Sequence, residues 1–303
     1  MNKYNYFLNK QLSRIDNHIH INYKKGRLEG SEHLLDSHWT LACESLNNNG
    51  FAKLPFNFRF INEYDFNFES IKNKQQIDNK LIFQKNLPTP NNFGKSSTSI
   101  SLNSEFFSDN IFTKELFILI KSYFKRDFWL RNSPTIMYDL NNFRNINHTQ
   151  EFYHLDWCDR QLTLVVLLND IDLESTHLKY VPQTNRKSWI LLNENRQSEK
   201  FSRITDKYIK KYGVIPVIGK KGDVFIFDAG NGLHKASYGK KDRGIINIIF
   251  SIKRTYAHFN ENYEKKNNLK QGEHYWRNKI EYNILEKYNK NLWEKSIFKY
   301  VNW

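Results

Sequence analysis

Six short runs rich in β-branched and aromatic residues follow one another between residues 127 and 254, and turn-forming residues separate them. Runs of this length and composition are typical of strands that pack on at least one face. Their number and spacing predict a β core built as a sandwich or barrel, with helices before and after it. The predicted strands are Thr135–Tyr138, Glu151–Asp156, Leu162–Leu168, Leu178–Val181, Val224–Phe227 and Ile245–Ile252.

Three helices are predicted outside these runs, in addition to a helical C-terminal tail. The first contains Leu35, Trp39, Cys43 and Leu46 at helical spacing, and Gly50 after it suits a left-handed C-terminal cap. A short strand over 51–54 follows it. The second helix begins after Thr113, a suitable N-cap, and the third runs from Glu199 to Lys211 and is stopped by Gly213.

The organisation predicted from these patterns is one domain over residues 1–303, a length that can bury a sizeable core. Residues 1–126 form a mainly helical N-terminal region, in which the polar and aperiodic stretch 56–104 is a long surface loop. Residues 127–254 form the β core with an insertion over 183–222. Residues 255–303 form a basic helical tail.

Composition narrows the class of protein. Hydrophobic residues make up 39% and charged residues 26%, which is typical of a globular chain. Two cysteines are too few for a disulfide framework, and no signal peptide or membrane-spanning run is evident, so a cytoplasmic location is expected. The net charge of +14 favours anionic partners and leaves nucleic acid, anionic metabolites and membrane surfaces open.

His154 and Asp156 are the strongest candidates for chemistry. Residues i and i+2 of a strand point to the same face, so an imidazole and a carboxylate can be directed at one point. His234 follows the apolar run 223–227 and would complete two histidines and one carboxylate if that run pairs near the first. Such a triad suits iron(II), because three coordination positions stay open. The alternative is a hydrogen-bonded pair on the protein surface.

Arg243 stands nine positions after His234, at the start of a very apolar strand. A guanidinium at such a position is costly unless it holds an anion, and its planar fork matches a carboxylate. The sequence therefore predicts that Arg243 binds a carboxylate within the β core.

Three blocks of the sequence resemble the phytanoyl-CoA dioxygenase family of iron(II)- and 2-oxoglutarate-dependent oxygenases. The first is His154-Leu155-Asp156-Trp157. The second is the acidic turn 167–174 with the segment 178–186, and the third is the stretch 221–228 that leads to His234 and Arg243. The likeness covers roughly residues 47–254, with the Asn49-Gly50-Phe51 segment as a weaker match.

The resemblance implies a double-stranded β-helix, the jelly-roll core of cupin-like proteins. Iron(II) would be bound by His154, Asp156 and His234, which are the catalytic residues, and 2-oxoglutarate would reach Arg243. The keto acid and dioxygen would yield succinate and CO2 while the substrate is oxidised. Related halogenases have a small residue in place of the carboxylate, so Asp156 favours hydroxylation.

Further residues are assigned within this resemblance. The hydroxyl groups of Ser237, Thr163 and Tyr138 are candidates for assisting Arg243 with the cosubstrate. Trp157, Lys235 and Lys207 are candidates for contacting the substrate, since lysines flank the expected mouth of the site and occur in the insertion. A solvated, lysine-rich surface is the other interpretation of these charges.

Three hypotheses on function follow. The first is a hydroxylase that acts on a small or medium anionic metabolite. The second keeps the chemistry and makes nucleic acid the substrate, using the positive charge and interleaved tyrosines. The third is a non-catalytic jelly-roll binding protein.

Overall fold

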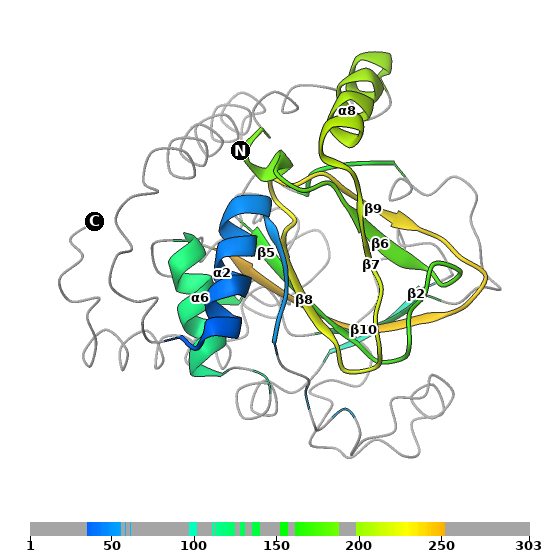
Figure 1. The fold of residues 1–303 in the computed structure, drawn as a ribbon. Helices are drawn as coiled ribbons and strands as arrows, with labels where there is room; N and C mark the ends of the chain where they lie inside the picture. Colours follow the sequence, from blue (N-terminus) through cyan, green and yellow to red (C-terminus); the bar gives the residue numbers. More distant parts are fainter. Residues whose placement is uncertain are drawn as a thin grey trace, which may run out of the picture.

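A computed structural model of the chain describes residues 35–55, 58, 61, 97–101, 111, 113–124, 128–130, 135–139, 152–156, 161–187 and 198–251. Within these residues two antiparallel sheets pack against each other, and two helices lie on the outer side of the larger sheet (Figure 1). Among the described residues, no helix combines the length and the apolar character needed to cross a membrane.

The larger sheet contains seven strands, and all of its pairings are antiparallel. Its strands are, in spatial order, β1 (Phe51–Lys53), β8 (Val224–Asp228), β5 (Gln161–Leu167), β10 (Arg243–Ser251), β4 (Thr135–Asp139) and β2 (Ser97–Ser101), with β3 (Trp129–Leu130) also paired to β10.

The smaller sheet contains β7 (Ile215–Val217), β6 (His177–Tyr180) and β9 (His234–Ser237) in that order, and His154 forms a bridge to His234 at its edge. From β4 onward the His154 segment, β6, β7 and β9 belong to the smaller sheet, and β5, β8 and β10 to the larger, so the chain crosses between the sheets at every step except from β6 to β7. This alternation defines a double-stranded β-helix. The predicted jelly-roll fold class, mainly β with flanking helices, is confirmed.

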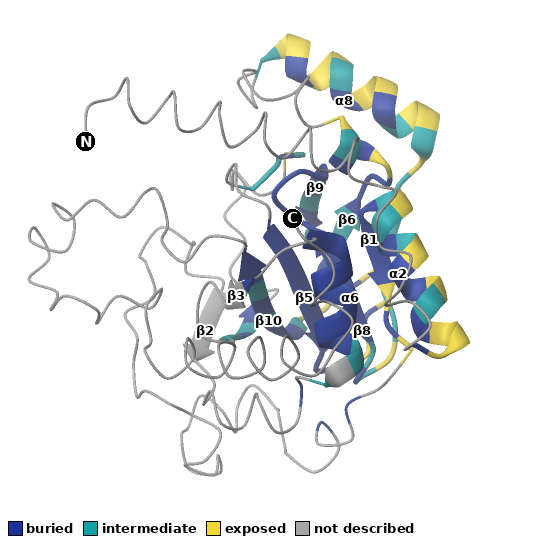
Figure 2. Ribbon diagram, turned by 90° about the vertical axis from the view of Figure 1, so that its left-hand side faces the viewer, coloured by how far each residue is buried: buried dark blue, intermediate teal, exposed yellow. Residues whose placement is uncertain are grey.

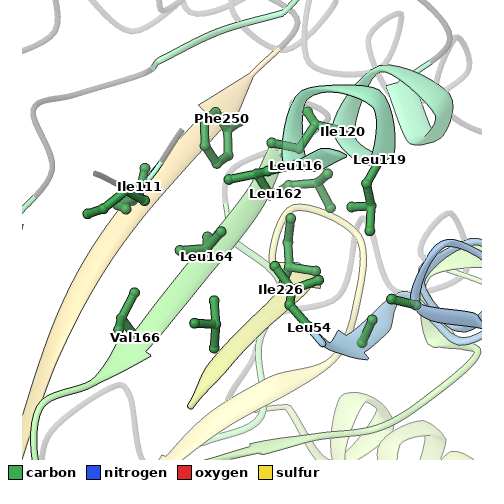
Figure 3. Close-up of a cluster of buried hydrophobic side chains, with 14 of the residues drawn as sticks. Leu54, Ile111, Leu116, Leu119, Ile120, Leu162, Leu164, Val166, Ile226 and Phe250 are labelled. Atoms are coloured by element: carbon green, nitrogen blue, oxygen red, sulfur yellow. The ribbon is translucent and has the colours of Figure 1, made fainter. Parts of the chain in front are cut away.

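The central strand β5 shows how the sequence builds two cores. Its residues are buried on both faces, which explains its uninterrupted apolar run. Leu162, Leu164 and Val166 point to the outer side and pack with α6 and neighbouring strands, as Figure 3 shows. Val165 and Leu167 point between the sheets and join a second cluster.

Helices α2 (Ser37–Asn49) and α6 (Lys114–Phe124) cover the outer face of the larger sheet and contribute buried residues to its core. The Asp36 side chain accepts a hydrogen bond from the Trp39 amide and caps α2. Gly50 ends that helix with a φ of 72°, a left-handed conformation that glycine adopts without steric cost. Thr113 caps α6 through the Leu116 amide at 3.2 Å.

The connection from β6 to β7 carries the short 3-10 helix η4 (Thr184–Arg186) and helix α8 (Glu199–Tyr212). Ser198 caps α8, and Gly213 ends it. Phe201, Thr205 and Tyr208 form its buried face, while the opposite face is exposed (Figure 2). The three helices predicted from these signals are therefore present: α2 ends before Gly50, α6 begins after Thr113, and α8 ends one residue beyond its predicted end at Lys211.

Several strand predictions need correction. The run 151–156 was expected to be a strand, but in its described part only His154 forms a bridge. Strand β7 lies inside the predicted insertion 183–222, where no strand was predicted, and its central Pro216 is tolerated because β7 is an edge strand. Strand β2 lies inside the predicted surface loop 56–104, since a polar edge strand has a loop-like sequence. The predicted tail 255–303 lies outside the described residues.

Candidate metal centre

Backbone pairing brings the three candidate ligands together. The His154 amide donates to the His234 carbonyl at 2.9 Å, and the His234 amide donates to the His154 carbonyl at 3.0 Å. Two residues later, the Asp156 amide donates to the Ala229 carbonyl at 2.8 Å. The first ligand segment is therefore fixed against the stretch that leads into β9, even though 80 residues separate the two histidines in the chain.

The side chains of these residues converge on one point. The ligand atoms of His154, Asp156 and His234 all lie within 4.8 Å of one another. Asp156 Oδ1 lies 3.7 Å from His154 Nε2 and 3.5 Å from His234 Nε2. The two imidazole rings are buried, with their centroids 4.4 Å apart, whereas Asp156 is partly exposed. A single divalent ion can bridge donor atoms at this spacing.

Each imidazole is held in the tautomer that a metal ligand needs. His154 Nδ1 lies 2.7 Å from the Phe152 carbonyl oxygen, and His234 Nδ1 lies 3.0 Å from the Gly232 carbonyl oxygen. A carbonyl oxygen only accepts, so Nδ1 carries a proton in each ring, and in the neutral imidazole the lone pair is on Nε2, the atom that faces Asp156. Donation from the second ring nitrogen to a carbonyl is the usual support of a metal-binding histidine.

Gln161, the first residue of β5, supports the carboxylate. Its Nε2 donates to Asp156 Oδ2 at 3.1 Å, on the oxygen other than the one that faces the histidines. Gln161 is buried, and its Oε1 has no hydrogen-bond partner among the described residues. The amide therefore orients the carboxylate and leaves Oδ1 directed toward the two rings.

The three residues line a pocket between the two sheets. Most of the remaining lining is apolar, and the polar exceptions are Thr163, Arg243 and Asn247. Thr163 Oγ1 is buried without a hydrogen-bond partner among the described residues, so a ligand in the pocket would find an unused hydroxyl there. The apolar lining residues are Met137, Val165, Leu167, Leu178, Val217, Phe227, Ala236, Ile245 and Ile249.

Arg243, at the start of β10, enters this pocket already paired with an acid. Its Nε donates to Asp139 Oδ2 at 2.7 Å, and its Nη2 contacts the same oxygen. Asp139 is the last residue of β4 and stands directly opposite Arg243 in the sheet register. Both side chains are largely buried. The predicted anion-binding guanidinium thus lines the pocket as part of a buried ion pair.

A buried polar cluster holds the turn that precedes His234. Asp228 Oδ1 accepts from the Asn231 amide at 2.9 Å, and its Oδ2 accepts from the Tyr123 hydroxyl at 2.5 Å. Burial, followed by the negative charge of Asp228, raises the pKa of Tyr123 well above its usual value. The same two causes raise the pKa of Tyr180. Both phenols therefore stay protonated, and the turn is anchored to the core behind the ligands.

Helix α8 packs on the segments that carry the ligands. Phe201 and Tyr208 of α8 form a buried cluster with Val181 and Leu233, and Tyr153 and Leu155 pack against it. Tyr153 and Leu155 flank His154, and Leu233 precedes His234. Burial raises the pKa of Tyr153. Helix α8 therefore supports both histidine segments from the side opposite the pocket.

The remaining predicted residues fall in different places. Thr163 lines the pocket, but Ser237 and Lys235 do not, because His234 and Ala236 occupy the inward positions of β9 and alternate residues point outward. Lys235 Nζ instead lies 5.2 Å from the centre of the Tyr153 ring.

Tyr138 is also not part of the pocket, because it lies with Ile136 in the outer core while Met137 faces inward. Lys207 is exposed on α8 and does not line the pocket. Trp157 lies outside the described residues.

The sequence reasoning missed Asp139, Gln161 and Asn247. Asn247 shares the inward face of β10 with Arg243 at a spacing of four, so the strand period could have identified it. Asp139 directly follows the predicted strand 135–138, and only the pairing of β4 with β10 places it opposite Arg243. No sequence signal singles out Gln161.

Fold and site together define a jelly-roll protein with a group of two histidines and one carboxylate at an internal pocket. No protein-family model matches the chain, and no curated protein sequence matches it. Solved structures do resemble it.

EctD from S. alaskensis, with 2-oxoglutarate and 5-hydroxyectoine, is 14% identical over 74% of this chain and 81% of that chain, with a TM-score of 0.47. The non-heme alpha ketoglutarate dependent epimerase SnoN from nogalamycin biosynthesis is 13% identical over 70% and 81%, with a TM-score of 0.45. The carbocyclase SnoK, from the same biosynthesis, is 12% identical over 73% and 86%, with a TM-score of 0.46. Likeness at this level assigns no activity to this chain.

Proposed function

We propose that the protein is an iron(II)- and 2-oxoglutarate-dependent dioxygenase. One observation carries the proposal: two histidine Nε2 atoms and a carboxylate oxygen converge, with both tautomers fixed, in a pocket that also contains a guanidinium. Two histidines and one carboxylate on one face of an ion leave positions for a chelating cosubstrate and dioxygen, which is the arrangement of non-heme iron oxygenases.

The residues fit both groups that the proposal requires. His154, Asp156 and His234 would hold the ferrous ion, and Arg243 with Thr163 would hold the keto acid, since the Thr163 hydroxyl is buried in the pocket without a partner among the described residues. When bound, iron with 2-oxoglutarate and dioxygen supplies the oxidising power and yields succinate and CO2.

We infer hydroxylation as the reaction. Asp156 occupies the position at which related halogenases have a small residue, so the place that a halide would take is filled by a carboxylate. The three sequence blocks around 154–157, 167–186 and 221–243 also favour membership of the phytanoyl-CoA dioxygenase family. The two cysteines, one of them the buried free thiol Cys43, favour a reducing, cytoplasmic location.

For the substrate we propose a small or medium anionic metabolite. The net charge of +14 favours an anion, and the exposed positions of α8, which supports the ligand segments, are rich in cations. These cations are Lys200, Arg203, Lys207, Lys210 and Lys211. A library of anionic metabolites, screened for stimulated succinate release, tests this choice.

The same cations favour nucleic acid as the second candidate substrate. Binding of single-stranded DNA or RNA would then weaken steeply with salt, because phosphate neutralisation releases counterions. Fluorescence anisotropy over a salt series measures the slope. A shallow slope with weak binding would remove this candidate.

The test of the oxygenase proposal is anaerobic titration of the protein with iron(II) and 2-oxoglutarate, which should produce the weak visible absorption of the chelate. His154→Ala and His234→Ala should abolish it. His177→Ala is the matched control, because His177 Nδ1 also bonds to a carbonyl two residues earlier, at 2.7 Å, but its side chain does not line the pocket. Failure of the unaltered protein to bind iron would instead favour a non-catalytic jelly-roll protein.

A further inference from the structure

Arg243, which lines the pocket that the proposed cosubstrate would occupy, is ion-paired with Asp139, which is not a lining residue. Arg243 shares the inward face of β10 with Ile245, Asn247 and Ile249, and Asp139 approaches it from the adjacent strand β4. Their side chains are 11% and 10% exposed, respectively. An ion pair this deeply buried is strongly oriented, because neither partner can exchange the other for water at low cost.

Among the described residues, the side-chain contacts of Arg243 occupy one side of the guanidinium. Asp139 Oδ2 accepts from Nε and is also contacted by Nη2. A guanidinium has five N–H donors in a planar fork, so the Nη1 side remains available for a second carboxylate. The geometry therefore permits an arrangement in which Asp139 holds one edge of Arg243 and a ligand carboxylate is bound at another.

We propose that Asp139 is a positioning residue for cosubstrate recognition: it fixes the Arg243 guanidinium so that its remaining donors face the distal carboxylate of the keto acid. This inference rests on the proposed function. It assigns to Asp139 a role in selectivity, because only a keto acid with a second carboxylate uses the positioned donors. Asp139 also balances the charge of Arg243 when no ligand is bound, which keeps an isolated cation out of an apolar pocket.

The prediction separates orientation from charge. Asp139→Ala removes both the acceptor and the negative charge, so the guanidinium loses its fixed plane. Asp139→Asn keeps an acceptor oxygen for Nε at nearly the same volume. We expect Asp139→Ala to weaken 2-oxoglutarate binding about tenfold, because the guanidinium is no longer oriented for a charge-assisted hydrogen bond to the ligand. Asp139→Asn should weaken 2-oxoglutarate binding less.

The experiment measures dissociation constants of 2-oxoglutarate and of pyruvate in the anaerobic iron(II) protein, by absorption titration. Pyruvate has the same keto-carboxylate head and no distal carboxylate, so Asp139→Ala should leave its affinity unchanged. In turnover, KM for 2-oxoglutarate should rise while kcat at saturation is retained. Asp170→Ala, which removes the exposed pair with Lys220, is the control for loss of an ordinary ion pair and should change neither affinity.

Each outcome has a distinct meaning. If Asp139→Ala leaves the ratio of the 2-oxoglutarate and pyruvate affinities unchanged, this inference alone is overturned. The isosteric Asp139→Asn variant gives the same comparison if Asp139→Ala does not fold, since a positioning role still predicts a changed ratio. An unaltered protein that binds iron but neither keto acid overturns the proposed function, and this inference with it.

Discussion

Gly232 offers the sharpest test of how the candidate site is built. Its carbonyl accepts from His234 Nδ1 at 3.0 Å, and its amide donates to the Asp228 carbonyl at 2.8 Å. A Cβ at this position would lie 2.0 Å from the Tyr180 hydroxyl and 2.4 Å from Tyr180 Cζ. The ring is fully buried, so it cannot move aside without displacing its neighbours in the core. Gly232→Ala must therefore shift the turn that orients His234.

The size of the effect follows from these distances. An ordinary carbon contact is about 3.5–4.0 Å, so ring and turn must separate by roughly 1–1.5 Å. A hydrogen bond of 3.0 Å does not survive such a shift, and loss of the supporting partner of a metal-binding histidine weakens the metal by about 10–100-fold, or about 1.4–2.8 kcal/mol. Separately from this loss of metal affinity, overpacking should lower the free energy of unfolding of the protein by ~1–3 kcal/mol.

Gly239→Ala is the matched control. Its Cβ would lie 2.0 Å from the Glu174 carbonyl oxygen, an equally severe clash, but in the turn between β9 and β10. Iron(II) or cobalt(II) titration against a competing chelator measures metal affinity, and urea unfolding followed by circular dichroism measures stability. Both variants should be less stable, and only Gly232→Ala should lose metal affinity. Equal metal affinities in the two variants would refute the reasoning.

Four further predictions use the same two assays. Gln161→Leu removes the donor to Asp156 and should weaken metal binding about tenfold; unchanged affinity would contradict the role of that contact. Tyr180→Phe deletes a buried hydroxyl without a partner among the described residues, so at pH 7 it should change the free energy of unfolding by less than about 1 kcal/mol. Tyr123→Phe removes a hydrogen bond to the buried carboxylate of Asp228 and should lower the free energy of unfolding by more. Burial, followed by the negative charge of Asp228, raises the pKa of Tyr180. The native state therefore keeps a proton that the unfolded chain loses above pH 10, and the free energy of unfolding should fall there by up to about 1.4 kcal/mol per pH unit for this group. Tyr180→Phe should remove this contribution to the pH dependence. Leu164→Ala, at the centre of β5, should cost about 3 kcal/mol in urea unfolding, and a cost below that of an exposed leucine such as Leu41 would contradict its place in the core.

Local signals predicted much of the fold because each has a short-range physical cause. The caps at Gly50, Thr113 and Gly213 fix helix ends through backbone conformation and hydrogen bonds within a few residues. The caps need no knowledge of the rest of the chain. The donor atoms of His154 and Asp156 converge as their spacing predicted, but the segment is not a strand, and its backbone hydrogen bonds to His234 and Ala229 hold it in place.

Features that depend on pairing were harder to predict. Tyr138 was expected at the cosubstrate and lies on the opposite face, because a shift of one residue reverses a side chain and only the pairing with β10 shows which face is inward. Ser237 and Lys235 were misplaced for the same reason, since β9 was not predicted as a strand. Asp139 acquires its significance only from its partner across the sheet.

The mutual backbone hydrogen bonds of His154 and His234 make the ligand set a product of the completed fold. Pairs so far apart in sequence close late and slowly during folding, because the entropy of the intervening loop must be overcome first. An ion that recognises this arrangement has no equivalent site on the unfolded chain, so its binding would add RT ln(1 + [metal]/Kd) to the folding equilibrium. Iron supply would then govern how long the folded protein persists as well as whether it is competent to react.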